Sequence, residues 1–298
     1  MLWERELVLK NDDEISFYIV DAFTRKPFRG NPAAVCLLQQ QREDDVLQSI
    51  ATEFNLSETA FLLNITEKPF KQSRVFALRW FTPKTEVPLC GHATLATATV
   101  IFHEFNGETS VLFKTLSGEL TARREGDSII LDFPSEVTIP TKPNHNLLRQ
   151  MGIREFEDAH LSKTSSTLLI QLKNEEILRS LTPNFDGMKS VSTKQNIDGV
   201  IVTSKGNPPY DFVSRFFAPW LGINEDPVTG SAHTILGPYW SNILRKQEMW
   251  AYQASARGGD LRVRVRKNRR VDLTGEAVIV SKGELSLSGY TSKDYSRV

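Results

Sequence analysis

KTEVPLCGHATLA at residues 84–96 and NEDPVTGSAHTIL at residues 224–236 carry the same pattern at two distant places in the chain. Each stretch has an acidic residue, a proline two positions later and a glycine that opens a run of small and apolar residues. Proline stiffens the chain ahead of the glycine, and the small residues that follow predict a buried helix. The repeated positions are Glu86, Pro88 and Gly91 in the first stretch and Glu225, Pro227 and Gly230 in the second.

Other landmarks repeat in the same order around these two stretches. RWFTP, beginning at Arg79, precedes the first stretch, and RFFAP, beginning at Arg215, precedes the second. SGELTAR at 117–123 resembles GGDLRVR at 258–264. The interval stays near 140 residues, which indicates an internal duplication and hence two similar lobes, because a period this long exceeds that of a solenoid.

The duplication and the local patterns together predict the domain organisation. We expect a charged extension at 1–14, a first lobe at 15–135 and a second lobe at 136–298, with the boundary in the proline-rich segment at 133–146. The last strand either stays with the second lobe or returns to the first. Each lobe mixes strands with a small-residue helix, so the predicted class is α+β (mixed α/β), with two pseudo-symmetric lobes that each wrap sheet around a central helix.

The composition excludes several classes of function. Lys plus Arg and Asp plus Glu are each 36, so no basic field is available to bind nucleic acid. No apolar stretch reaches the roughly 20 residues that span a bilayer, and the first residues lack a signal-peptide pattern. We therefore expect a cytoplasmic protein without membrane or nucleic-acid partners. Two cysteines and five scattered histidines show no metal-ligand spacing, so no metal site is expected.

The two helix starts predict a site for an anion. Unpaired backbone NH groups and the positive end of the helix dipole meet there, and a glycine lets a ligand approach closely. If the lobes face one another, both starts converge on one cleft and can hold a small carboxylate. The alternative is an ordinary turn in which Thr229 or Ser231 caps a helix. Neither stretch has a GxxxxGK or GxGxxG pattern, so no nucleotide cofactor is indicated.

Glu58 in LSETAFLL is the candidate for moving a proton. A carboxyl group on an apolar strand face has a raised pKa, which suits a general acid and base. The alternative is a capping box with Asn55, if a helix begins there. His92 can donate a hydrogen bond or shuttle a proton, or it is a buried structural histidine. Asp226 can orient a substrate or only hold its own loop.

Cys90 and Thr229 occupy matching places before the two glycines. Two thiols there would allow a racemase in which one removes the proton and the other returns it from the opposite face. A threonine hydroxyl has too high a pKa for that role. Cys90 alone is also typical of a small buried residue that packs as a hydrophobe.

Several ordered motifs resemble the PhzF family, most closely its animal branch, the phenazine biosynthesis-like domain-containing proteins. They are DAFTRKPFRGNPAAV, NLSETAFL, RWFTPKTEVPLCGHATLA, FFAPWLGINEDPVTGSAH and RGGDL. The resemblance implies a diaminopimelate epimerase-like fold, a homodimer and a cofactor-free isomerase; PhzF itself acts on a cyclic amino acid, and that substrate is not carried over to this chain. It places the proton-shuttling glutamate at Glu58 and the supporting catalytic residues at His92, Asp226 and Ser231. The implied substrate-binding residues are Asn31, Gly91, Gly230, Thr229 and Cys90.

We therefore expect a cofactor-independent isomerase that transfers a proton on a small carboxylate-bearing substrate, with Glu58 as general acid and base between the lobes. A racemase or epimerase that uses Glu58 or Cys90 is the enzymatic alternative. The alternative from another class is a regulatory protein that binds a ligand or protein in the same cleft without turnover. The second lobe has Thr229 where a two-thiol epimerase has its second cysteine, and the fold alone does not name the substrate.

Overall fold

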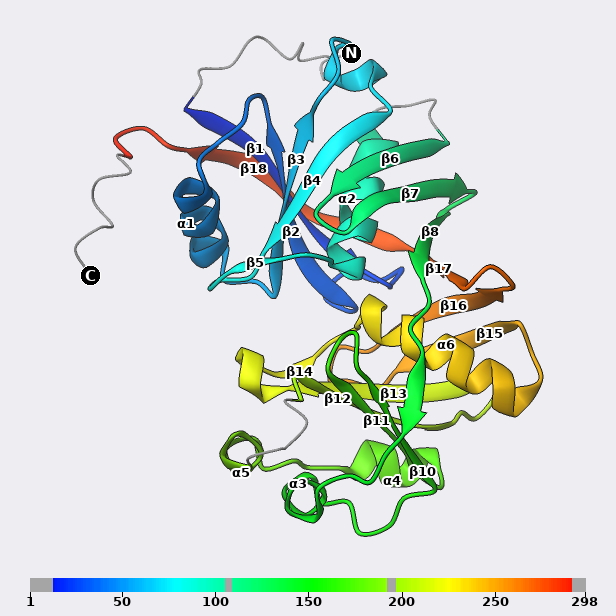
Figure 1. Ribbon diagram of the computed structural model, residues 1–298. Helices are drawn as coiled ribbons and strands as arrows, with labels where there is room; N and C mark the ends of the chain where they lie inside the picture. The colour runs from blue at the N-terminus through cyan, green and yellow to red at the C-terminus, as the bar shows by residue number, and fades with distance from the viewer. Residues whose placement is uncertain (1–12, 105–108, 192–196, 291–298) are drawn as a thin grey trace.

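The computed structural model describes residues 13–104, 109–191 and 197–290, and these form two lobes of similar build (Figure 1). In each lobe a curved sheet surrounds one long helix, α2 (Gly91–Glu104) in the first and α6 (Gly230–Leu244) in the second. The predicted α+β fold with two pseudo-symmetric lobes is confirmed. Residues 1–12 of the expected extension lie outside the described residues.

The first lobe has a mixed sheet with a fixed order of pairings. β1–β2 is antiparallel, β2–β3 parallel, β3–β4 antiparallel, β4–β6 parallel, and β6–β7 and β7–β8 antiparallel. Helix α1 (Asp44–Phe54) connects β2 to β3 and packs on the sheet face opposite α2. The strands are β1 (Glu14–Ala22), β2 (Asn31–Leu38), β3 (Glu58–Asn64), β4 (Val75–Phe81), β5 (Glu86–Val87), β6 (Ser110–Thr115), β7 (Gly118–Glu125) and β8 (Ser128–Pro134), with a 3-10 turn η1 (Phe70–Gln72).

The second lobe repeats this order strand for strand. β10–β11 is antiparallel, β11–β12 parallel, β12–β13 antiparallel, β13–β15 parallel, and β15–β16 and β16–β17 antiparallel. This repeated order of strand pairings agrees with the internal duplication that the sequence predicts. The elements are β9 (Thr138–Pro140), α3 (His145–Met151), β10 (Asp158–Ser162), β11 (Thr167–Gln171), α4 (Glu175–Ser180), α5 (Phe185–Ser190), β12 (Gly199–Lys205), β13 (Phe212–Ala218), η2 (Pro219–Leu221), β14 (Ile223–Asp226), β15 (Glu248–Gln253), β16 (Gly259–Arg266) and β17 (Arg270–Gly275).

Two strand pairings join the lobes. β17 pairs antiparallel with β8 at the junction. The last strand, β18 (Ala277–Ser286), then runs back into the first lobe and pairs antiparallel with β1, as Figure 1 shows. The two halves are therefore tied by backbone hydrogen bonds as well as by side chains, which holds the helix starts of both lobes at one junction.

The same arginine–glutamate pair anchors the strand before each helix start. Arg79 binds Glu86 through Nε and Nη2 at 2.7 and 2.8 Å, and Arg215 binds Glu225 in the same way at 2.7 and 2.9 Å. Such two-pronged contacts fix the orientation of both groups. They hold β5 and β14 against β4 and β13, and thereby set where the segments leading into α2 and α6 begin.

Small residues allow α2 to be buried on almost every side. Its buried positions include Ala93, Ala96 and Ala98, which let the surrounding strands come close. Thr94 and Thr97 lie on the same helix, and their hydroxyls donate to backbone carbonyls four residues earlier, so their burial leaves no unsatisfied donor. In the part of the chain that the structure describes, no helix has the length and apolar character needed to cross a membrane.

Candidate active site

Glu58 begins β3 directly after the turn that ends α1. Asn55 adopts the left-handed conformation as the C-cap of α1, so no helix begins there and the capping-box interpretation of Glu58 is wrong. Alternation along β3 puts Glu58 on the same strand face as Ala60 and Leu62, which belong to the core around α2. Its side chain is 14% exposed, and its Oε2 atom is buried, with Nε2 of His92 as a polar neighbour at 3.3 Å.

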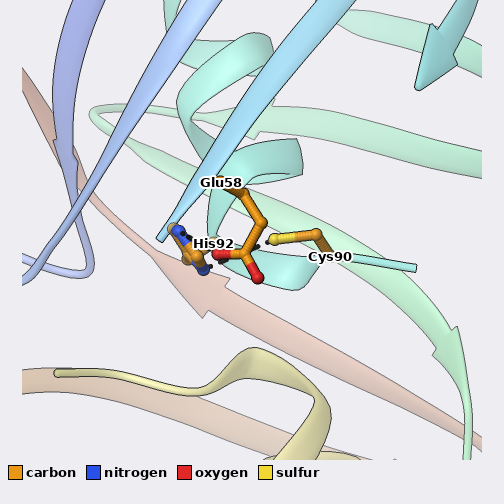
Figure 2. Close-up of side chains that lie close together, drawn as sticks. All are labelled: Glu58, Cys90 and His92. Atoms are coloured by element: carbon orange, nitrogen blue, oxygen red, sulfur yellow. Dashed lines mark hydrogen bonds and ion pairs between the residues drawn. The ribbon is translucent and has the colours of Figure 1, made fainter. Parts of the chain in front are cut away.

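His92 and Cys90, at the start of α2, lie beside this carboxyl group (Figure 2). The Nε2 atom of His92 is 3.3 Å from Oε2 of Glu58, and its Nδ1 atom is 3.4 Å from Sγ of Cys90. The hydroxyl of Ser57 lies 3.2 Å from the same Nε2 atom. The imidazole therefore bridges the thiol on one side and the carboxyl group on the other.

Burial sets the protonation states of these three groups. Desolvation, followed by the negative charge of Asp226, raises the pKa of Glu58 to about 8, although hydrogen bonds from Ser57 and Cys90 oppose the rise. Burial lowers the pKa of His92 to about 3 and raises that of the Cys90 thiol well above its ordinary value. Near pH 7 the cluster therefore holds a protonated carboxyl group, a neutral imidazole and a thiol.

Asp226 lies across the lobe junction in a second polar cluster. Its carboxylate accepts a hydrogen bond of 2.9 Å from Nδ2 of Asn31 and a short one from the hydroxyl of Thr229. Desolvation raises the pKa of Asp226, and these two hydrogen bonds oppose the rise. Because the charge of Asp226 raises the pKa of Glu58, whereas no charge of Glu58 raises that of Asp226, Asp226 is the carboxyl group of the pair that ionises more readily.

Gln253 on β15 fixes the loop that carries Asp226. Its Nε2 atom donates to the carbonyl of Asp226 at 2.8 Å and to the hydroxyl of Thr229 at 3.1 Å, and its Oε1 atom accepts from the Thr229 amide at 2.9 Å. Thr229 is the N-cap of α6, but its side chain makes no capping hydrogen bond. Its hydroxyl instead belongs to the Asp226 cluster.

The starts of α2 and α6 meet at the junction. A Cβ atom added to Gly91 would lie 3.0 Å from Cα of Gly230, and one added to Gly230 would lie 3.0 Å from Cα of Gly91. Any side chain at either position would therefore push the two backbones apart. The amide nitrogens of His92 and Ser231 are 3.5 and 3.6 Å from these added positions, so the free NH groups of both helices gather at one place.

The residues predicted for the site fall into three adjoining groups. The structure brings together Glu58, His92 and Cys90; Asn31, Asp226 and Thr229; and Gly91 and Gly230 with Ser231. Ser57 links the first two groups, because its hydroxyl lies 3.2 Å from His92 and donates to Oδ1 of Asn31 at 3.2 Å. Ser57 and Gln253 were not predicted. The neighbour of Glu58 in the chain could have been considered, whereas no pattern in the sequence points to Gln253.

Glu58, Cys90 and His92 each offer one ligand atom, and these atoms lie within 4.8 Å of one another. Such a set suits a soft divalent ion in its residue types. The geometry fits less well, since the thiol faces Nδ1 of the ring and the carboxyl group faces Nε2. One ion can bind only one of these nitrogens, so the arrangement matches a chain of proton donors and acceptors better than a metal centre.

We expect replacement of Asp226 with asparagine to lower the pKa of Glu58. The variant keeps the size of the side chain but removes the negative charge that raises this pKa, while desolvation remains. A carbon-13 NMR titration of the Glu58 carboxyl group measures the change. Asp186→Asn is the control, since Asp186 is 93% exposed on the second lobe. An unchanged Glu58 titration in Asp226→Asn would show that the two carboxyl groups do not interact.

A family model for the PhzC-PhzF phenazine biosynthesis-like proteins matches residues 20–283. Phenazine biosynthesis-like domain-containing protein 1 from Mus musculus is 49% identical over 92% of this chain and 99% of its own length. A protein from Halalkalibacterium halodurans that is named an uncharacterized isomerase is 46% identical over 91% and 98%. The crystal structure of a PhzF family protein from Enterococcus faecalis has a TM-score of 0.82 at 41% identity, over 91% of this chain and 98% of that one.

More distant structures share the fold alone. A hydroxyproline epimerase from Agrobacterium vitis, solved with trans-4-hydroxy-L-proline bound, has a TM-score of 0.54 at 12% identity, over 92% of this chain and 93% of that one. The relatives support an activity of the general isomerase kind, whereas this distant likeness concerns the fold only.

Proposed function

Because the chain belongs to the PhzC-PhzF family of phenazine biosynthesis-like proteins, we propose that it is a cofactor-independent isomerase that moves a proton between carbons of a small carboxylate-bearing substrate. Glu58 is the general acid and base of this reaction. The observation that carries the proposal is a desolvated carboxyl group with a pKa of about 8, next to two converging helix starts. A pKa close to the working pH lets one group both accept and return a proton.

One proton moves from one carbon of the substrate to another by way of Glu58, and no other reactant is needed. The ionised Glu58 takes a proton as a C–H bond breaks, and the electron pair moves into the conjugated substrate. The NH groups at Gly91 and Gly230 stabilise the substrate carboxylate and the negative charge that develops. The O–H bond on Glu58 then breaks as its proton joins another carbon, which restores the carboxylate. A cyclic amino acid with a ring double bond, or a related unsaturated acid, has a C–H bond of this kind and a double bond that accepts the electron pair.

The neighbouring polar groups support this cycle in different ways. Neutral His92 can accept a hydrogen bond at Nε2 from protonated Glu58, which holds the carboxyl group in place when it carries the proton. Asp226 favours the protonated form of Glu58 through its charge, and Asn31 holds Asp226 across the junction. Ser231, next to Gly230 and half-buried, is placed to bind the substrate at the helix start.

Proton transfer by one group on one face of the substrate fits this site better than racemisation by two bases on opposite faces. A racemase needs a second acid or base opposite the first, and Thr229 stands where the second thiol would be. Its hydroxyl donates to Asp226 and accepts from Gln253, so it is committed to the structure of its own loop. Cys90 lies on the same side as Glu58 and has a raised pKa, which lowers the amount of reactive thiolate.

Exchange of solvent deuterium into a substrate tests the proposal. The native protein is incubated in deuterated water with cyclic and acyclic amino acids and with unsaturated carboxylates, and mass spectrometry detects deuterium at carbon. We expect label with at least one compound, no label with Glu58→Gln, and equal label after treatment with a chelator. Ligand binding without any label would support the regulatory-protein alternative instead. Label that depends on added zinc would favour metal chemistry at the same three side chains.

We also propose that the protein forms a homodimer, as the family resemblance implies. Light scattering after size exclusion tests this, and a mass of twice the 33.7 kDa chain is expected. A mass equal to one chain would contradict it.

A further inference from the structure

In both lobes a buried side chain binds the carbonyl group that precedes the helix glycine. The hydroxyl of Thr94 donates to the carbonyl of Cys90 at 2.5 Å. The Nδ1 atom of His233 lies 2.8 Å from the carbonyl of Thr229. Each donor stands four residues after its acceptor, so Thr94 and His233 occupy equivalent places in the duplicated helices.

His233 has one protonation state that agrees with its surroundings. It is fully buried, and burial lowers its pKa to about 4, so the ring is neutral near pH 7. Because a carbonyl group can only accept, Nδ1 carries the ring proton and Nε2 is left bare. Nε2 is buried and has no hydrogen-bond partner among the described residues. Burying Nε2 without a partner costs free energy, and an apolar side chain at this position would avoid that cost. The presence of histidine therefore points to a role for its Nδ1 donor.

The reason lies in the geometry of the peptide bond. A trans peptide is planar, and its C=O and N–H groups point in opposite directions. Fixing the carbonyl of Thr229 therefore also fixes the direction of the Gly230 N–H group. In the first lobe, the Thr94 hydroxyl donates to the Cys90 carbonyl beside the Thr94 amide, which donates to it at 3.2 Å, and the two together fix the Cys90–Gly91 peptide. The two glycines meet at the junction, where these NH groups are free of helix partners.

We propose that His233 is a positioning residue for substrate binding, which aims the Gly230 amide at the substrate carboxylate by holding the Thr229–Gly230 peptide, as Thr94 does for Gly91. This inference rests on the proposed function, which supplies the carboxylate. His233 itself touches no substrate. Its replacement is therefore expected to weaken carboxylate binding and to leave the protonation of Glu58 unchanged.

Two replacements with the same side-chain branching separate the effect of the hydrogen-bond donor from the effect of losing the ring. His233→Asn keeps an N–H donor near the place of Nδ1, whereas His233→Leu has the same number and branching of side-chain heavy atoms as asparagine and no donor. Acetate serves as the probe, and proton–nitrogen NMR follows the Gly91 and Gly230 amides of the full chain during its titration. We expect the acetate dissociation constant measured at Gly230 to stay within about twofold in His233→Asn and to rise about three- to tenfold in His233→Leu, as for loss of one hydrogen-bonded contact.

The first lobe gives an independent form of the same test. Thr94→Val removes the hydroxyl at nearly constant size, and Thr94→Ser retains it. Valine is expected to weaken acetate binding at Gly91 by a similar factor, and serine is not. The Glu58 titration should be the same in all four variants.

The outcomes distinguish this inference from the proposed function. Equal weakening in the asparagine and leucine variants would assign His233 a role in packing only and overturn the inference, while the carboxylate site would stand. Equal binding in every variant would show that holding the Thr229 carbonyl does not affect carboxylate binding, and it would also overturn the inference. If acetate leaves both glycine amides of the native protein unshifted, the carboxylate site itself is wrong, and the inference fails with it.

Discussion

Replacing Glu58 with glutamine is expected to lower the rate of deuterium incorporation by at least about 1,000-fold, within the range that a general acid and base contributes. Glutamine keeps the size of the side chain but cannot accept the substrate proton. The rate is measured with whichever compound the native protein labels. Glu53→Gln is the matched control, because Glu53 is exposed on α1 and should leave the rate unchanged. A Glu58→Gln rate within tenfold of the native rate would assign the proton transfer to another group.

The same variant has a pH signature in stability. The pKa of Glu58 is about 8 in the folded chain against an ordinary 4.5, so its proton stabilises the folded state. That contribution is complete below about pH 4.5 and is lost as the pH rises through about 8. Glutamine does not ionise, so the melting temperature of Glu58→Gln relative to native should be higher at pH 9 than at pH 5. A difference that does not change with pH would mean that Glu58 ionises normally.

Replacing Arg215 with methionine is expected to lower the free energy of unfolding by about 3–5 kcal/mol, as for a buried ion pair that loses one partner. Arg215 is 9% exposed and holds Glu225 with two hydrogen bonds. Its Nη1 atom also donates to the carbonyls of Leu178 and Leu181, at 3.2 and 2.7 Å. The variant leaves a carboxylate and two carbonyl groups without this donor.

The first lobe supplies the matched control for Arg215. Arg79 makes the equivalent pair with Glu86, but their side chains are 28% and 23% exposed, and Arg79 forms a further ion pair with the exposed Asp44. Arg79→Met is therefore expected to cost about 1 kcal/mol. Urea unfolding at pH 7 compares the two variants. Equal losses of unfolding free energy in the two variants would contradict a larger contribution from the more deeply buried pair of the second lobe. Since Glu225 precedes Asp226, the loss of Arg215 should also disturb the site.

The sequence predicts the fold well because its strongest patterns are local. The β-branched and aromatic residues of ISFYIVDAF and RVFALRWF are typical of strands, and the structure has β1 and β4 there. The small residues after Gly91 predict a buried helix, which α2 confirms. The repeated landmarks predict two lobes because duplication preserves the order of motifs. The ion pair between Arg79 and Glu86 could not be predicted from the sequence, since the shape of the turn that separates them is not known from it.

The site is predicted less completely, because it depends on contacts between distant parts of the chain. Glu58 is found from its apolar strand neighbours, which are local. The bond from Asn31 to Asp226 spans 195 residues, and the bonds of Gln253 depend on how β15 lies against the loop before α6. His233 is separated by only four residues from its acceptor, but its role appears only when its place is compared with that of Thr94.

The ionisation of Glu58 in the native protein tests the central claim most directly. Carbon-13 labelling of glutamate, with Glu58→Gln to assign the signal, allows the carboxyl group to be followed by NMR from acidic to alkaline pH. A buried proton carrier between the lobes predicts a midpoint near 8. A midpoint near 4.5, the ordinary value for glutamate, would show that water reaches the group freely and would remove the physical basis for its role as acid and base.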